Sequence, residues 1–174
     1  SNRFIIDLYD ELQKAIPDPE LFFKMGKTIY KSKHFFKIAI GMPLFGPYRA
    51  LKKLTTENSK YNRIKDYFLL KNTKGHAIFR IVHRDNIIIN QATMMWNVGV
   101  FDSYTRLTGA SDVKVTAKCI EQGPKKEGDP GHGIWEFDIK FKDHHLFDRI
   151  FNSLLYVIPT IRDTIDNANQ IQEE

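Results

Sequence analysis

The sequence predicts an α+β fold in which an antiparallel sheet of about four strands, arranged as two hairpins, is covered by helices on one face. Residues 112–122 and 132–142 alternate apolar with charged side chains, which is typical of strands that have one buried and one solvated face. Residues 63–72 and 77–82 alternate in the same way around a glycine-containing turn, the pattern of a β-hairpin. Helical periodicity dominates the N-terminal third, so helices are the available cover for the apolar face.

Several helical segments are expected before the first strand. Residues 3–16 carry an apolar stripe at helical spacing. Asp18-Pro19 is a helix-start signal, an N-cap acid followed by proline at the first helical position, and it predicts a second helix. Residues 35–42 predict a further helical turn or two, and residues 48–58 a fourth helix.

A helix over residues 90–107 is expected between the two hairpins, closed by Gly109. From Ala92 to Phe101 its residues are apolar almost all round. A helix of that kind is buried on every side, so it should lie between the sheet and a second surface. The N-terminal helices, a twin subunit or a ligand cavity could supply that surface.

A last helix is expected from about Asp143, with Phe147, Ile150, Phe151 and Leu154 packing inward. Farther on, the apolar spacing changes to a two-heptad seam, formed by Ile158, Ile161, Ile165, Ala168 and Gln172. Such a seam is typical of a dimer stalk or of a helix leading to another domain. An ordinary surface helix would explain it equally well.

Charge and composition exclude several classes of protein. The net charge of +5 arises in residues 1–84, whereas residues 85–174 are acidic. Because the lysines of the basic half alternate with apolar residues, they indicate a solvated helix face, and we expect no nucleic-acid partner. No apolar run approaches the roughly 20 residues that a membrane span needs. The single cysteine fits a reducing compartment, so a cytoplasmic protein without membrane insertion is expected.

Metal and catalytic motifs are weak. Only Cys119 and His132 could meet, across one hairpin loop, and two ligands do not hold zinc. Cys119 lies on an apolar strand face, where a thiol is a poor nucleophile. The loop at residues 122–133 has glycines and lysines but neither Walker spacing nor a following helix. We therefore expect no metal site and no enzymatic activity.

The apolar centre of the chain is the most informative region for function. Aromatic and thioether side chains there could line a cavity for an apolar ligand, or they could simply fill the core. The candidate ligand-binding residues are Met94, Met95, Trp96 and Phe101 from the helix, with Phe68 and Phe79 from the sheet.

A family resemblance is carried by Asp18–Gly26, Tyr61–Lys65, Trp96–Val100, Cys119 and Gly128–His132. With these segments the chain resembles the ligand-sensing domains related to the four-vinyl reductase and haem–nitric-oxide-binding fold. In bacteria such domains lie upstream of histidine kinases, nucleotide cyclases or aromatic-catabolism activators. The resemblance implies a homodimeric α+β domain with a hydrophobic cavity between sheet and helices, coupled to an output module.

The resemblance also bears on cofactors. The activator branch binds zinc partly through a Cys…Gly-Asp-Pro-x-Cys pattern; here Cys119 and Gly128–Pro130 are present, but His132 replaces the later cysteine. No thiol occurs at residues 94–96, where another ligand would be expected. The haem branch needs a proximal histidine in a helical pocket, and no histidine of this chain falls on an apolar helix face. We expect neither zinc nor haem.

These observations predict a small-molecule sensor domain of a bacterial signal-transduction protein. Residues 1–158 would form the ligand-sensing domain and residues 159–174 a helical stalk towards a downstream kinase- or cyclase-type output domain. The domain would dimerise and bind a small apolar or aromatic ligand. Two alternatives are a ligand-free dimerisation or protein-interaction module and, less in keeping with the motifs, an enzyme acting on a hydrophobic substrate.

Overall fold

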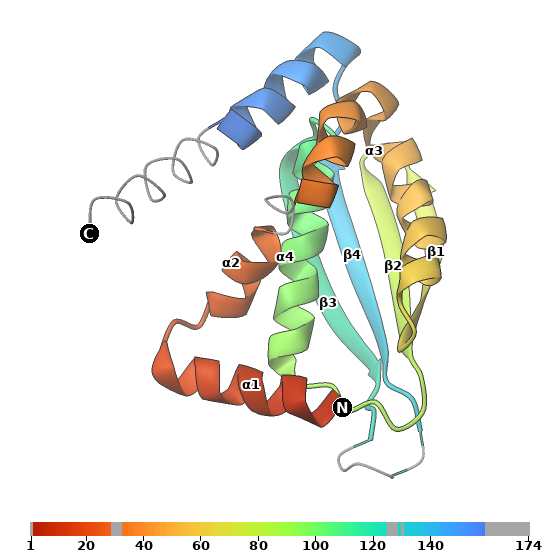
Figure 1. Cartoon of the computed structure of the whole chain (residues 1–174). Helices are drawn as coiled ribbons and strands as arrows, with labels where there is room; N and C mark the ends of the chain where they lie inside the picture. Colours follow the sequence, from red (N-terminus) through yellow and green to blue (C-terminus); the bar gives the residue numbers. More distant parts are fainter. Residues whose placement is uncertain (1, 29–32, 125–128, 130, 159–174) are drawn as a thin grey trace, which may run out of the picture.

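The computed structural model describes residues 2–28, 33–124, 129 and 131–158, and for residues 2, 33–40 and 58–61 the backbone alone. Its strands form one antiparallel sheet with the order β1-β2-β4-β3. They are β1 (Lys65–Thr73), β2 (His76–His83), β3 (Ser111–Glu121) and β4 (Ile134–Lys142). The helices are α1 (Asn2–Ala15), α2 (Leu21–Lys27), α3 (Lys33–Tyr61) and α4 (Gln91–Leu107), with a final helix at residues 146–158 (Figure 1). The predicted α+β class and its two hairpins are confirmed.

The two faces of the sheet differ in chemistry, as the alternating pattern predicts. On the inner face Phe79 of β2 pairs with Phe137 of β4, and both rings are fully buried. On the outer face the neighbouring pair is Arg80 and Glu136, and Arg80 Nε donates to Glu136 Oε1 at 3.0 Å. Since a charged face is stable in water, only the inner face needs a helical cover.

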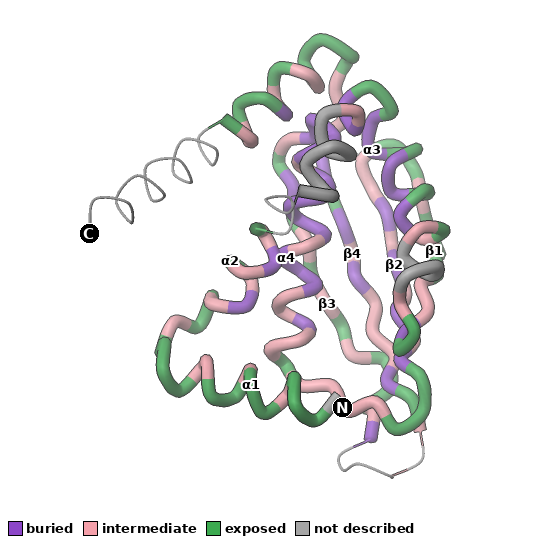
Figure 2. The backbone as a smooth tube through the Cα atoms, viewed as in Figure 1, coloured by how far each residue is buried: buried purple, intermediate pink, exposed green. Residues whose placement is uncertain are grey.

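Helices α3 and α4 supply that cover (Figure 1). The ring of Phe101 in α4 lies between those of Phe79 and Phe137, with both centroid distances 5.0 Å. The phenol of Tyr104 donates to the carbonyl of Ala50 at 3.1 Å and so joins α4 to α3. Figure 2 shows the buried segments concentrated on α4 and the strands that it covers.

The third helix is bent. Residues 35–42 and 48–58, predicted as separate segments, both fall within α3, which is interrupted at Gly46 with φ 69° and ψ 169°. A positive φ is readily adopted by glycine, and the following Pro47 has no N–H to continue the helical hydrogen bonds. The two predicted segments are therefore two helices that meet at a kink within the range of α3.

The second surface around α4 is helix α2. The two backbones approach closely at a pair of glycines. A Cβ added to Gly26 would lie 2.1 Å from the carbonyl oxygen of Trp96, and one added to Gly99 would lie 2.1 Å from that of Phe23. Only glycine permits this separation, because any side chain would overlap the opposite backbone. The prediction that α4 is buried on both sides is confirmed, and an N-terminal helix supplies the second surface.

The final helix differs from its prediction. Phe147 and Phe151 are 85% and 62% exposed, and Leu154 is exposed as well, so the expectation that they pack inward is wrong. The inward side carries Tyr156 and Val157, which pack against the core, and Ser153, whose hydroxyl donates to the Leu107 carbonyl at 3.0 Å. A hydropathy pattern does not predict a hydrogen bond of this kind between a side chain and a distant carbonyl. The predicted heptad seam at residues 159–174 lies outside the described residues.

None of the helices in the described part of the chain is both long enough and apolar enough to cross a membrane.

Candidate functional site

The N-terminal half of α4 borders two features that could bind a ligand. Asn90 caps this helix, because its side-chain oxygen accepts from the backbone N–H of Thr93 at 2.9 Å. One turn after Thr93, Asn97 donates to the Thr93 carbonyl at 2.6 Å, and its own oxygen accepts from Lys65. One is a cavity where this half of α4 meets α1 and α2. The other is a buried lysine at the contact between this half of α4 and the sheet.

The cavity between α1, α2 and α4 (the α1–α4 cavity) has a volume of about 470 Å³. At its base the rings of Tyr9 and Phe22 contact each other, with centroids 4.9 Å apart. Asn90 Nδ2 donates to Asp10 Oδ1 at 3.3 Å and links α4 to α1 beside it. The lining combines apolar and polar side chains: Tyr9, Asp10, Gln13, Pro19, Phe22, Asn90, Gln91, Ala92 and Met95.

The buried lysine is Lys65, at the start of β1, which is 6% exposed. Its Nζ donates to Asn97 Oδ1 at 3.0 Å, and it lies 5.5 and 5.8 Å from the ring centroids of Tyr67 and Trp96. Burial lowers the pKa of Lys65 to about 8, because desolvation disfavours the charged form. Burial also raises the pKa of the Tyr67 phenol.

His83 of β2 is the direct strand partner of Lys65, so both side chains lie on the inner face. It is 1% exposed, and its Nδ1 lies 3.3 Å from the carbonyl oxygen of Gly133. Desolvation, followed by repulsion from Lys65, lowers the pKa of His83 to about 4. A carbonyl can only accept, so Nδ1 carries the proton in the neutral ring and Nε2 is left as an acceptor. That Nε2 is buried and has no hydrogen-bond partner among the described residues.

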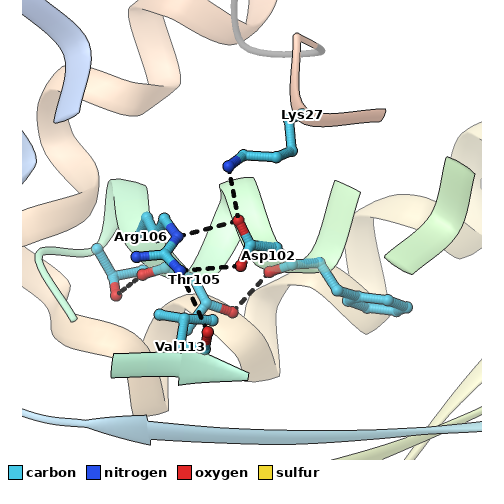
Figure 3. Close-up of polar contacts among 7 residues, drawn as sticks. Lys27, Asp102, Thr105, Arg106 and Val113 are labelled. Atoms are coloured by element: carbon cyan, nitrogen blue, oxygen red, sulfur yellow. Dashed lines mark hydrogen bonds and ion pairs between the residues drawn. The ribbon is translucent and has the colours of Figure 1, made fainter. Parts of the chain in front are cut away.

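A separate charged cluster fastens the other end of α4 (Figure 3). The buried carboxylate of Asp102 accepts two bonds from Arg106, at 3.0 and 3.2 Å, and lies 3.6 Å from Lys27 Nζ of α2. Arg106 also donates to the carbonyl of Val113 in β3 at 3.1 Å. The buried Asp102 carboxylate is paired with two cations, and the cluster joins α2, α4 and β3.

The structure separates the six predicted ligand-binding residues. Met94, Phe101 and Phe79 belong to the close-packed core, where they fill space. Met95 lines the α1–α4 cavity, and Trp96 lies beside Lys65. Phe68 is not brought together with the others.

Phe68 lies on the outer face of the sheet. It pairs with Arg80, is 49% exposed, and lines a different hollow of about 510 Å³ between α3 and β1. The residue of β1 that reaches α4 is Lys65. The alternation indicates that Lys65 and His83 lie on the inner face. Lys65 falls on the same side of its strand as Tyr67 and Leu69, and His83 on the same side as Phe79 and Ile81.

Cys119 and His132, the one pair that the sequence would allow to meet, contact other residues. His132 Nδ1 lies 3.0 Å from the carboxylate of Asp85, and the Cys119 thiol lies 3.9 Å from the side-chain oxygen of Gln122. Within the described ranges no three histidine, cysteine or acidic side chains are arranged to hold a metal ion.

The α1–α4 cavity does not fit haem. Haem iron needs an axial ligand, normally histidine, cysteine or tyrosinate, or methionine together with histidine. Among the described residues that line this cavity there is neither histidine nor cysteine. Met95 therefore has no histidine with which to share the iron, and burial raises the pKa of the Tyr9 phenol, which disfavours the tyrosinate.

Comparison with solved structures identifies a shared fold. The chain is similar to a Cs H-NOX mutant carrying 4-cyano-L-phenylalanine, with a TM-score of 0.52 and 11% identity over 82% of this chain and 74% of that chain. A second H-NOX structure, from work on H-NOX activation, has a TM-score of 0.49 and 12% identity over 79% and 71% of the two chains. No family model matches the chain, and no curated protein matches it significantly. The first similarity shows that the chain has the H-NOX fold.

Proposed function

We propose that this chain is a sensor domain that binds a small apolar or aromatic molecule in the cavity between α1, α2 and α4. The observation that carries the proposal is the cavity itself, whose 470 Å³ lies within the range of small-molecule sites. Tyr9, Phe22 and Met95 would contact the apolar part of the ligand, and Asn90 and Gln91 any polar group. The H-NOX fold, which the resemblance links to sensing, supports the same class of function.

The position of the cavity suggests how binding would be transmitted. Helix α4 is held by the sheet and by the glycine contact with α2, whereas α1 reaches the cavity through Tyr9 and through the Asp10–Asn90 hydrogen bond. A ligand would therefore shift α1 relative to α4, provided that it binds the two arrangements with different affinity. The signal would pass to a kinase- or cyclase-type output domain of a cytoplasmic bacterial protein.

Filling the cavity tests this assignment. We expect Ala92→Phe to weaken binding of the neutral probe N-phenyl-1-naphthylamine at least about tenfold, because the new ring occupies space that the ligand needs. Probe fluorescence measures the affinity, and circular dichroism verifies the fold. Phe68→Ala, in the hollow between α3 and β1, is the matched control and should leave the affinity unchanged. Equal affinities in all three proteins would refute the assignment.

The final helix favours a second candidate function, dimerisation. Five large apolar side chains at spacings of three and four residues form one exposed stripe: Phe147, Phe151, Leu154, Leu155 and Ile158. A contiguous apolar patch on a soluble domain commonly marks a protein interface. We propose that a second copy of the chain packs on this stripe, either with the sensor function or, as the alternative, as a ligand-free interaction module.

The dimer has its own test. Phe151→Glu should convert the dimer to a monomer in sedimentation velocity, because a carboxylate would be buried in an apolar interface. Thr116→Glu makes the same charge change at an exposed site on the sheet and should leave the dimer intact. A monomeric unsubstituted protein, or a Phe151→Glu variant that still dimerises, would exclude the stripe as the interface.

A further inference from the structure

Lys65 is a buried cation without an anion. Its ammonium group has three donors, and the interaction with Asn97 occupies one of them. Among the described residues no carboxylate lies within ion-pair distance of Nζ. The rings of Tyr67 and Trp96 stabilise a cation through their faces, but a ring supplies far less than an ionised partner. Fully buried lysines are almost always paired, so this arrangement calls for a partner from outside the fold.

The second unmatched group, His83 Nε2, lies next to the first. Lys65 and His83 are paired across β1 and β2, on the same face, and close enough for the lysine charge to depress the pKa of the imidazole. An unpartnered buried nitrogen is costly, and two unmatched polar groups at one place can be satisfied by one ligand. In its neutral form Nε2 can only accept a hydrogen bond, and after taking up a proton it can only donate one.

We propose that Lys65 and His83 bind a small carboxylate anion between β1, β2 and α4. One carboxylate oxygen accepts from Lys65 Nζ and the other from His83 Nε2–H, after the imidazole takes up one proton from solvent. Neither Lys65 nor His83 lines either of the two cavities described above, and acetate, a small carboxylate, is the probe chosen for this site. This site is separate from the α1–α4 cavity, and neither assignment depends on the other.

Proton uptake makes the binding dependent on pH. The titratable groups that face the site are Lys65 and Tyr67 from β1 and His83 from β2, whereas α4 contributes the uncharged Asn97 and Trp96. A bound anion favours the imidazolium and so raises the pKa of His83 from about 4. Between about pH 4 and pH 8, where Lys65 is still charged, the affinity therefore falls as the pH rises, by at most a factor of ten per unit.

The experiment follows the His83 ring by NMR during titration with sodium acetate, with sodium chloride at equal ionic strength as the reference. We expect acetate, but not chloride, to raise the pH midpoint of His83, and isothermal titration to show tighter binding at pH 5.5 than at pH 7.5. Lys65→Met should weaken acetate binding at least about tenfold. Lys71→Met, an exposed lysine on the same strand, should not.

Two results would overturn the proposal. In one, acetate leaves the His83 midpoint unchanged in the unsubstituted protein, a measurement that requires no substitution in the core. In the other, the midpoint moves equally with chloride or in the Lys65→Met variant, which would show general salt screening instead of a carboxylate held by the lysine.

Discussion

Gly99→Ala is expected to lower the free energy of unfolding by about 3 kcal/mol, although alanine is the better helix former. The new Cβ would lie 2.1 Å from the Phe23 carbonyl oxygen of α2 and 3.0 Å from the Lys27 nitrogen. Both are backbone atoms, so no side chain can turn away, and the two helices would have to separate. Separation would also strain the contact between Lys27 and the buried Asp102 (Figure 3).

Gly41→Ala is the matched control. Gly41 also lies within a helix, but among the described side chains an added Cβ would meet only the Phe45 ring, at 3.9 Å, an ordinary contact. Alanine should there raise the free energy of unfolding by about 0.5–1 kcal/mol. Urea denaturation of both variants gives the comparison. If Gly99→Ala were as stable as Gly41→Ala, the close approach of α2 and α4 would be wrong.

The second large effect is a dependence of stability on pH that arises from Lys65. Its pKa is about 8 in the folded protein and 10.5 as the ordinary value, so between these values the unfolded chain binds more protons than the folded one. The free energy of unfolding should therefore rise with pH across this window, by about 3 kcal/mol in total and by about 2 kcal/mol between pH 7 and 9.5. In Lys65→Met this rise should be absent.

The pH range is chosen so that the change in stability reports the ionisation of Lys65 and not that of the buried tyrosines. Burial raises the pKa of Tyr67 and Tyr104, so these phenols stay protonated in the folded protein after they ionise in the unfolded chain, which lowers stability above about pH 10. Chemical denaturation in acetate-free buffer from pH 7 to 9.5 avoids that range. Lys71→Met should keep the slope of the unsubstituted protein. A Lys65→Met variant that also keeps it would show that Lys65 is not desolvated.

The six predicted ligand-binding residues lie in different places because hydropathy does not distinguish a cavity wall from a close-packed core. Met94 and Met95 are adjacent and chemically identical, yet one fills the core and the other lines the α1–α4 cavity. The helical turn sends them to different sides of α4. The sequence did not predict a buried Lys65, because a lysine in a strand normally lies on the solvated face.

Local chemistry along the chain determined the sheet, its two hairpins and the burial of α4. Period-two alternation states which face of a strand is apolar, and an all-apolar helix has no solvated side. These are properties of neighbouring residues, so the sequence contains them.

Only the tertiary structure shows which residues of different elements contact each other across those faces. The Gly26–Gly99 contact, the cavity between α1 and α4, and the pairing of Lys65 with His83 each depend on segments far apart in the chain. So does the exposure of Phe147 and Phe151, because Ser153, Tyr156 and Val157 are the residues of that helix that contact the rest of the fold. Periodicity assigns a residue to a face but does not say which residue lies opposite, because the distances between elements are set by packing of the whole fold.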